Sequence, residues 1–272
     1  MNEHEPTLVL GDCLDEMKNI PDGSVDMILT DLPYGVCNKD SEAGKWDSQI
    51  PLTPLWNHFL RITKKNAAIV LFSQGMFTAT LMMSQPKLWR YNLIWDKCRA
   101  SGFLNANRMP LRRHEDICVF YRSLPKYNIQ LEDLNGREPS HVQGFGKHKK
   151  TNRCYGSVER WKTAYIPGVE GKKFPGSIIK FPRPHCTGNH PTEKSVDLCR
   201  WLIRSFTDKG ETVLDATMGS GTTGVAAVLE GRRFIGIEKD IQYFNLSRER
   251  TTRAIQTPRQ QYLFCNNIGD TK

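Results

Sequence analysis

The sequence predicts an α/β protein with a mostly parallel sheet and helices on both faces of that sheet. Three observations lead to this fold. Short apolar runs rich in Val, Ile and Leu recur along the chain and are typical of buried strands. Segments with helical spacing follow several of these runs, and a helical connection makes neighbouring strands parallel. A glycine-rich loop joins one strand directly to one helix.

The first 121 residues contain five predicted strands and three short predicted helices. Clusters of Pro, Asp, Gly and Ser separate them and mark turns. A polar, unpatterned stretch at 36–50 is long enough to indicate a functional loop. The predicted strands are 7–10, 25–30, 67–72, 91–95 and 117–121, and the predicted helices are 15–20, 55–62 and 77–83.

Residues 122–185 interrupt this alternation and hold most of the positive charge. Between 122 and 184, thirteen basic residues stand against five acidic ones, an excess of eight in a chain of net charge +9. Seven aromatic residues are interleaved with them. Cations for phosphates and rings for stacked bases suit a nucleic-acid surface. A solvated insertion whose aromatic residues form a small core of its own is the alternative.

Regular alternation returns after residue 186 with an amphipathic helix through Leu198, Trp201 and Phe206. One domain is therefore expected to be interrupted by one insertion. The remaining predicted elements are strand 212–215, helix 222–229, strand 234–238 and helix 243–250. The predicted parts are 1–121 and 186–257 for the main domain, 122–185 for the insertion and 258–272 for a polar tail.

Asp31 begins a short motif, Asp31-Leu32-Pro33-Tyr34, directly after the predicted strand 25–30. Ligands of open α/β sheets bind at the carboxyl ends of the strands, where this motif lies. A carboxylate can accept a hydrogen bond from an exocyclic amine, and an aromatic ring can stack on a flat base. The motif therefore predicts a site for an amino group of a nucleobase.

The loop from Gly219 to Gly224 follows a strand, opens a helix and has the spacing G-x-G-x-x-G. Glu238 stands about 20 residues further on, where an acid can bind both hydroxyls of a ribose. Asp215, at the end of the preceding strand, would repel a pyrophosphate but attract an amine. S-Adenosyl-L-methionine, with its adenosine and its amino-acid end, suits this loop better than a dinucleotide. An NAD(P) enzyme is the alternative.

Three motifs in order identify a resemblance to the β class of amino-group DNA methyltransferases. Asp31-Leu32-Pro33-Tyr34 resembles the Asp-Pro-Pro-Tyr motif of the family, residues 215–223 resemble its cofactor loop, and 190–194 resemble its helix-start motif. The resemblance implies a circularly rearranged Rossmann-like methyltransferase fold with a seven-stranded sheet and an inserted target-recognition region. Leu32 replaces a proline, but its backbone carbonyl remains. Ser195 replaces a proline at a helix start.

The resemblance implies direct transfer of a methyl group to the N6 amino group of adenine in DNA. Asp31 and the carbonyl of Leu32 would accept the two N–H groups, with Pro33 shaping the turn and Tyr34 stacking on an extruded base. A sulfonium beside Asp31 would keep its carboxylate ionised. The expected catalytic residues are Asp31, Leu32, Pro33 and Tyr34.

The resemblance also implies contacts to S-adenosyl-L-methionine. Asp12 would contact the adenine amine of the cofactor, Lys194 its carboxylate and Glu238 its ribose. Asp12 has a turn-forming role as its alternative. The expected cofactor-binding residues are Asp12, Cys13, Asp31, Lys194, Asp215, Met218, Gly219, Ser220, Gly221, Thr222, Thr223 and Glu238.

DNA is the expected partner, and a membrane is not. The segment 97–113 is a second basic stretch, and the loop 36–50 carries an exposed-looking tryptophan. The resemblance leaves a homodimer and a cognate restriction nuclease open. The expected DNA-binding residues are Trp46, Arg108, Arg112, Arg113, Lys147, Lys149, Lys150 and Arg153.

Other functions remain alternatives at this point. An N4-cytosine DNA methyltransferase is the first, because the preference for adenine rests on Asp31 where N4 enzymes of the family more often have serine. An RNA N6-adenine methyltransferase and a DNA-binding protein without catalysis are further alternatives. Ring-carbon methylation of cytosine is disfavoured, since the chain contains no Pro-Cys pair.

The eight cysteines are scattered without a Cys-x-x-Cys pair, which favours free thiols over disulfides or metal. A zinc site from His148, Cys154, His185 and Cys186 is an alternative whose spacing fits no common ligand pattern. The first residues lack a signal peptide, and no long apolar run is present. We therefore expect a cytoplasmic protein without metal, inside a bacterial or phage-infected cell.

Overall fold

The computed structural model describes residues 5–35, 47–133, 172–183 and 193–257. The chain divides into two compact units, one of residues 1–128 with 177–272 and one of 129–176. In the second unit the described residues form one short antiparallel pair, β6 (Glu132–Asp133) with β7 (Lys172–Lys173). In the described part of the chain, no helix has the length and apolar character needed to cross a membrane.

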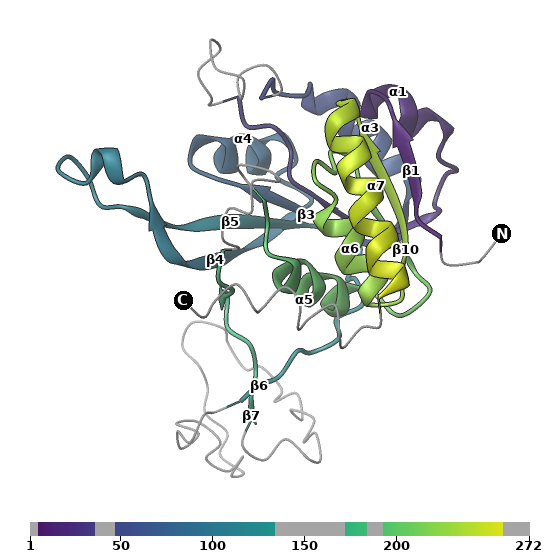
Figure 1. The fold of residues 1–272 in the computed structure, drawn as a ribbon. Helices are drawn as coiled ribbons and strands as arrows, with labels where there is room; N and C mark the ends of the chain where they lie inside the picture. Colours follow the sequence, from purple (N-terminus) through teal and green to yellow (C-terminus); the bar gives the residue numbers. More distant parts are fainter. Residues whose placement is uncertain (1–4, 36–46, 134–171, 184–192, 258–272) are drawn as a thin grey trace. The chain divides into compact units, whose positions relative to one another are not determined.

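An eight-stranded sheet forms the centre of the first unit, in the order β1-β10-β9-β2-β3-β5-β4-β8 (Figure 1). The five strands from β1 to β3 are parallel, and β5 runs antiparallel to both β3 and β4. The strands are β1 (Thr7–Leu10), β2 (Val25–Thr30), β3 (Thr63–Ser73), β4 (Trp89–Ser101), β5 (Arg112–Phe120), β8 (Ile178–Lys180), β9 (Thr212–Asp215) and β10 (Arg233–Glu238).

The sheet therefore has one strand more than the seven expected. The additional strand is β8, which pairs in parallel with β4 through Ile94 and Ile178. Its residues belong to the segment predicted as part of the insertion. Ile179, in the middle of β8, is buried in the main core, and this burial explains why the chain rejoins the sheet there.

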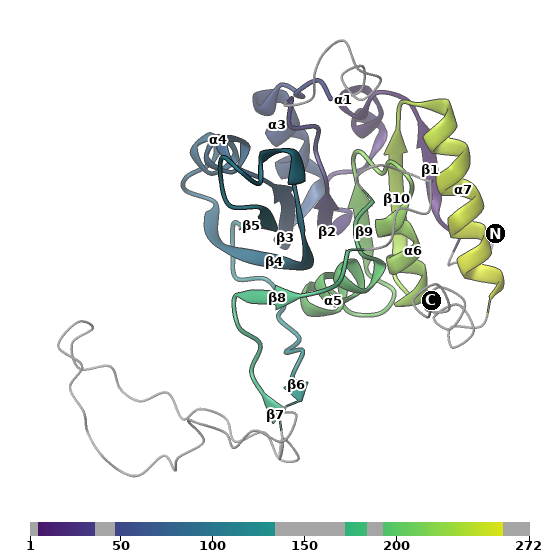
Figure 2. The ribbon, with the colours of Figure 1, turned by 60° about the vertical axis from the view of Figure 1, so that its left-hand side comes forward.

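Helices cover both faces of the sheet, as the sequence predicts (Figure 2). Side chains alternate along β2, so Met27 and Leu29 pack on one face while Ile28 packs on the other. The first face carries α5 and α6, and the second carries α1, α3 and α4. The helices are α1 (Cys13–Glu16), α3 (Leu52–Ile62), α4 (Met76–Ser84), α5 (Val196–Phe206), α6 (Thr222–Leu229) and α7 (Ile241–Gln256), with a 3-10 turn η1 (Met17–Asn19) after α1.

The strands β4 and β5 form a hairpin that is longer than the sequence predicts. The basic segment 97–113, a connection by its sequence, continues both strands and includes a single 3-10 turn, η2 (Phe103–Asn105). Between the pairs Asp96–His114 and Ser101–Arg112 the register shifts, because β4 has more residues there than β5. This bulge bends the hairpin where it leaves the sheet.

Candidate active site

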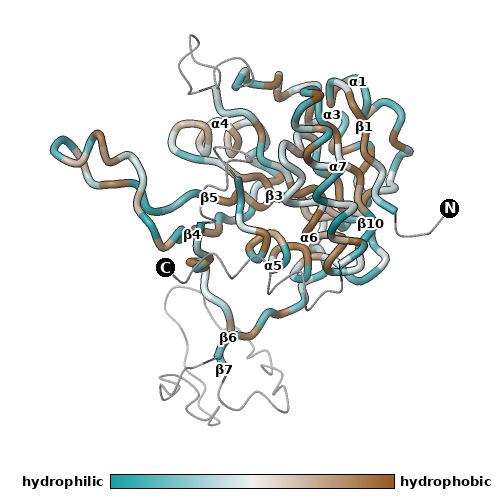
Figure 3. The backbone as a smooth tube through the Cα atoms, in the orientation of Figure 1, coloured by the Kyte–Doolittle hydropathy of each residue, from teal (hydrophilic) through white to brown (hydrophobic). Residues whose placement is uncertain are grey.

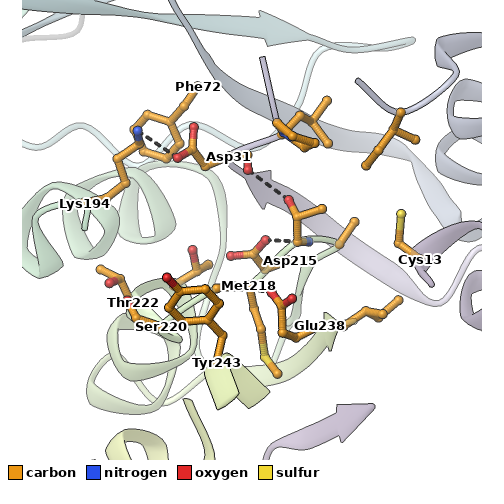
Figure 4. Close-up of a pocket in the computed structure, with 18 of the residues that line it drawn as sticks. Cys13, Asp31, Phe72, Lys194, Asp215, Met218, Ser220, Thr222, Glu238 and Tyr243 are labelled. Atoms are coloured by element: carbon orange, nitrogen blue, oxygen red, sulfur yellow. Dashed lines mark hydrogen bonds and ion pairs between the residues drawn. The ribbon is translucent and has the colours of Figure 1, made fainter. Parts of the chain in front are cut away.

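A cavity of about 300 Å³ opens at the carboxyl ends of the parallel strands. Asp31 follows β2, Ala216 follows β9 and Gly11 follows β1, while Glu238 ends β10, and all four line the cavity. Figure 4 shows side chains from these strand ends facing the same space. The position agrees with the general rule for open α/β sheets.

Asp31 and Tyr34 lie together at one end of the cavity. The Tyr34 hydroxyl donates to Asp31 Oδ1 at 2.8 Å. One face of the Tyr34 ring is stacked on Phe77, with centroids 5.0 Å apart and planes at 28°. Burial, followed by the nearby Asp31 carboxylate, raises the pKa of Tyr34 well above its usual value, so the phenol keeps its proton and remains a donor. Leu32 is buried, and Pro33 lines the cavity.

Lys194 provides the positive charge beside Asp31. Its Nζ lies 2.8 Å from Asp31 Oδ2 (Figure 4). The same atom lies 3.0 Å from Glu115 Oε2. Burial raises the pKa of Asp31, and the ammonium of Lys194 acts in the opposite direction. The Asp31 side chain nevertheless remains 28% exposed toward the cavity. Its carboxylate can therefore meet a ligand.

Glu115 extends this charge network away from the cavity. Lys97, which is almost completely buried, places Nζ 3.2 Å from Glu115 Oε1. Burial alone would raise the pKa of Glu115, but the two ammonium groups hold it below its usual value. The order Lys97, Glu115, Lys194, Asp31 alternates in sign, so each buried charge has a partner.

Asp215 connects the end of β9 to the end of β2. Thr30 Oγ1 donates to Asp215 Oδ1 at 2.7 Å, and the Thr217 N–H donates to the same oxygen at 3.2 Å. The Thr217 hydroxyl in turn donates to the backbone carbonyl of Asp31 at 3.0 Å. Burial raises the pKa of Asp215 to about 6, although these donors lower it. A cationic ligand nearby would favour the ionised form.

Glycines allow the loop after β9 to fold tightly. Gly221 caps α6 with a φ of +81°, and a Cβ on it would lie 2.7 Å from Ser247 of α7. Gly236 in β10 gives space to Met218, since a Cβ there would lie 2.4 Å from the Met218 sulfur. Glycine at 221 therefore lets the loop pack against α7, and glycine at 236 leaves room for Met218 at the wall of the cavity.

Glu238 holds two backbone segments at the cavity. Its Oε2 accepts from the Gly219 N–H at 2.8 Å, and its Oε1 accepts from the Asp240 N–H at 2.9 Å. Burial raises the pKa of Glu238, while these donors lower it. Each carboxylate oxygen has further acceptor capacity, which two neighbouring hydroxyls of a ligand could use.

Asp12 has the turn-forming role that the sequence offered as an alternative, and it also lines the cavity. As the N-cap of α1, it accepts from the Leu14 N–H at 2.9 Å. Cys13 follows it, and burial raises the pKa of its thiol to about 12, so it remains neutral. Ser195 is the N-cap of α5, the helix start that the sequence predicted at this substitution.

The structure brings nearly all expected catalytic and cofactor residues into this one cavity. The exception is Gly221, whose role is in the backbone of the loop. The expected residues among those that line the cavity are Asp12, Cys13, Asp31, Leu32, Pro33, Tyr34, Lys194, Asp215, Met218, Gly219, Ser220, Thr222, Thr223 and Glu238.

The cavity wall also contains residues that the sequence pattern did not single out. Phe72 and Gln74 stand at the carboxyl end of β3, and the rule for strand ends could have found them. Glu115 lies on an antiparallel strand within a basic segment, where no local pattern marks it. Further residues of this group include Asp47, Glu193, Thr217, Lys239 and Tyr243.

The expected DNA-binding residues fall into two groups. Arg108, Arg112 and Arg113 are exposed on the β4–β5 hairpin. Arg113 is also paired with Asp96, at 2.8 and 3.1 Å, and Arg112 Nη1 donates to Gln74 Oε1 at 3.2 Å. The others lie outside the described residues: Trp46, Lys147, Lys149, Lys150 and Arg153.

The four residues of the alternative zinc site also lie outside the described residues: His148, Cys154, His185 and Cys186. Within the described ranges, no group of three or more His, Cys, Asp or Glu side chains is arranged to hold a metal ion. In the same ranges four thiols are free, three of them buried.

The chain belongs to the N6/N4 family of DNA methylases, whose sequence model matches residues 25–249. It is 27% identical to the DNA adenine methyltransferase YhdJ of Escherichia coli, covering 90% of this chain and 82% of that protein. The fold is similar to the M1.HpyAVI–SAM complex, with a TM-score of 0.57, 22% identity, and coverage of 90% and 98%. It is also similar to the cytosine-N4-specific PvuII DNA methyltransferase, with a TM-score of 0.63, 13% identity, and coverage of 97% and 93%.

Proposed function

We propose that this DNA methyltransferase transfers a methyl group from S-adenosyl-L-methionine to the N6 amino group of adenine. The observation that carries the proposal is the position of Asp31. Its carboxylate is held by Lys194 and Tyr34 in the same cavity as Asp12, Asp215 and Glu238. An acceptor for an amine thus stands beside a set of acids that suits the cofactor.

The acidic side chains of the cavity fit the chemical groups of the cofactor. Glu238 can accept from the ribose hydroxyls, and Asp12 from the adenine amine. Asp215 can face the ammonium of the amino-acid end, with Met218 providing an apolar contact. When bound, S-adenosyl-L-methionine supplies an electrophilic methyl group on a sulfonium.

The residues around the target base have to make the adenine amino group, a weak nucleophile, reactive. The lone pair of an adenine amino group is delocalised into the ring. Asp31 accepts one N–H and the carbonyl of Leu32 accepts the other, which favours a pyramidal nitrogen. The hydroxyl of Thr217 holds the Asp31 backbone at 3.0 Å, so the two acceptors keep a fixed geometry. Tyr34, supported from behind by Phe77, offers a ring for the extruded base.

Lys194 has two roles in this proposal. It neutralises Asp31, and it is the cation available for the carboxylate of the cofactor. A contact with that carboxylate would draw the ammonium from Asp31 and expose the catalytic oxygen to the amine. Glu115 would then hold Lys194 within reach of both groups.

Transfer of labelled methyl groups to DNA, followed by digestion to nucleosides, tests the proposal. We expect N6-methyladenine from the wild-type chain and far less from Asp31→Ala. N4-methylcytosine without N6-methyladenine would instead support the second candidate, which the likeness to a cytosine-N4-specific enzyme favours. Label in RNA but not in duplex DNA would support an RNA enzyme, and no label in either would support a binding protein without catalysis.

DNA binding in this proposal depends on the basic insertion 122–185 and on the β4–β5 hairpin. The excess charge of the insertion suits phosphate contacts, which give affinity without sequence information. A homodimer and a paired restriction nuclease are further proposals, which sedimentation and a search of the neighbouring genes would test.

A further inference from the structure

The tip of the β4–β5 hairpin, residues 102–111, exposes an unusual amount of apolar surface. Phe103 is 79% exposed, Leu104 is 97% exposed and Met109 is 49% exposed. Figure 3 shows apolar segments at this tip, next to hydrophilic ones, and Figure 1 shows the tip beyond α4. Neighbouring apolar side chains on a projecting tip contribute nothing to the core, and such surfaces mark sites of interaction.

The charges around the tip indicate which partner it suits. Between residues 98 and 114 the chain has four arginines, Arg99, Arg108, Arg112 and Arg113, and no acidic residue. Asp96 and Gln74 hold two of these guanidinium groups against the hairpin, as described above. Arginines around an apolar tip suit a DNA duplex, because they can contact the phosphates on its outside while the apolar side chains contact the stacked bases inside.

The base of the hairpin is part of the catalytic cavity. Glu115 of β5 lines the cavity, and so does Gln74, whose Nε2 donates to the carbonyl of His114 at 3.1 Å. From Glu115 to Arg112 is three residues of strand, or about 10 Å. The tip is therefore attached directly to the wall of the site that would receive the target base.

The bulge in β4 fixes the direction in which the hairpin leaves the sheet. Cys98 has a left-handed backbone with a φ of +58°. Asp96 Oδ1 accepts the Cys98 N–H at 2.9 Å and also accepts from Arg113 at 2.8 Å. Cys98, in a strained backbone conformation, is therefore bound by the same carboxylate oxygen that binds Arg113 of the opposite strand, which indicates that the bend is specified rather than accidental.

We propose that Phe103 and Leu104 form a wedge that enters the base stack of DNA beside the target nucleotide while the base moves into the cavity. This inference rests on the proposed function, in which the substrate is a base in DNA. A base in a duplex cannot reach the Asp31 carboxylate until it is unstacked and unpaired. Apolar side chains inserted at the vacated step replace part of the lost stacking and keep the base from returning.

The test compares the double variant Phe103→Ala/Leu104→Ala with a control, Met83→Ala/Leu124→Ala. The control removes two other exposed apolar side chains, 74% and 80% exposed, neither of which lines the cavity. Methyl transfer is measured on a duplex that carries the target sequence found by sequencing of methylated DNA. It is also measured on the same duplex with an abasic site opposite the target base, where unpairing is already complete.

We expect the wedge variant to lose roughly ten- to a hundred-fold in kcat/KM on the intact duplex, the equivalent of one stacked base. On the abasic duplex the loss should be less than about three-fold, and the control variant should match the wild type on both. Equal losses on the two duplexes, or no loss on either, would overturn the proposal.

Two further measurements distinguish a DNA wedge from an inactive enzyme and from a surface for self-association. If the wild-type chain transfers no methyl group, the proposed function fails. In that case the target duplex is found by selecting the DNA that the wild-type chain binds. Fluorescence anisotropy with this duplex, intact and with an abasic site, still tests the wedge, because the wedge variant should lose affinity mainly for the intact duplex. Sedimentation without DNA tests a second copy of the chain as the occupant of the tip. A change of oligomeric state in the wedge variant alone would overturn the assignment to DNA.

Discussion

The ammonium of Lys194 lies between two carboxylates, 2.8 Å from Asp31 Oδ2 and 3.0 Å from Glu115 Oε2. The Lys194 side chain is only 11% exposed, so these charges interact with little screening by water. Lys97 forms an ion pair with the other oxygen of the Glu115 carboxylate. The ionisation of Asp31 therefore depends on Glu115, a residue that does not touch it, as well as on Lys194.

Replacement of Asp31 by Ala should abolish most methyl transfer and leave the affinity for S-adenosyl-L-methionine largely unchanged. In the proposed chemistry the carboxylate contacts the amine, and the cofactor is expected to be held by Glu238, Asp12 and Asp215. We expect a fall of roughly 10²–10³-fold in the single-turnover rate, comparable to loss of one preorganised polar group in an active site. Calorimetric titration with the cofactor provides the second measurement. Equal loss of rate and cofactor affinity would show that Asp31 mainly binds cofactor.

Glu115→Gln should move the acid limb of the rate–pH profile to lower pH. In the proposed mechanism transfer needs the Asp31 carboxylate, so we expect the rate to fall as pH falls through the pKa of Asp31, which burial raises. The charge of Glu115 raises that pKa further, and Lys194 lowers it. In Glu115→Gln, Lys194 is paired with Asp31 alone, so the pKa of Asp31 decreases.

Lys194→Gln should move the same limb in the opposite direction. Asp31 then keeps its burial and the repulsion from Glu115 but loses the cation, so its pKa rises. Lys194→Arg retains the charge and should leave the limb close to that of the wild type. Displacements of the same sign in the Glu115 and Lys194 variants would contradict this charge coupling, since a purely structural disturbance has no reason to give opposite signs.

The sequence is informative about the site wherever a residue ends a parallel strand. Asp31, Asp215 and Glu238 could be placed together in advance, because the carboxyl ends of β2, β9 and β10 meet at one edge of the sheet. The motif order and the alternation of elements predicted the fold in the same way. These inferences depend only on local pattern and on the topology that the pattern implies.

Glu115 and β8 could not be found in that manner. The place of Glu115 in the cavity depends on the register of β5 against β4 and on the bulge after Asp96, which arise from pairing between distant residues. The strand β8 has three residues and joins the sheet only because Ile179 is buried there. The predicted pairing of Lys194 with the cofactor carboxylate stays a prediction, beside the observed pairing with Asp31.

Asp215→Asn should stabilise the folded chain increasingly as the pH rises from about 4 to about 7. Burial raises the folded pKa of Asp215 from 3.8 to about 6, so the folded state binds this proton more tightly than the unfolded state. The stabilising contribution is present below pH 4 and is lost as pH rises through 6. The difference between variant and wild type should reach about 3 kcal/mol of unfolding free energy.

Denaturant unfolding at several pH values measures this difference. Asp208→Asn is the control of opposite sign, because the hydrogen bond from Lys126 lowers the pKa of that exposed carboxyl. A difference between Asp215→Asn and wild type that does not change with pH would contradict the prediction. Asp215→Asn should also bind the cofactor more weakly, since it lacks the charge expected to face the ammonium.

DNA affinity should fall steeply with salt, and the insertion should account for much of the slope. Each phosphate contact that is lost reduces the slope of log K against log salt by about 0.9 in magnitude. The triple variant Lys147→Gln/Lys149→Gln/Lys150→Gln should therefore lower the slope by about 2–3 and weaken binding to all DNA sequences alike. The triple control Lys65→Gln/Lys87→Gln/Lys209→Gln removes the same charge from exposed positions of the main domain and should change the slope little. Fluorescence anisotropy over a range of salt concentrations gives both slopes, and equal slopes for the two variants would show that net charge, rather than the insertion, binds the phosphates.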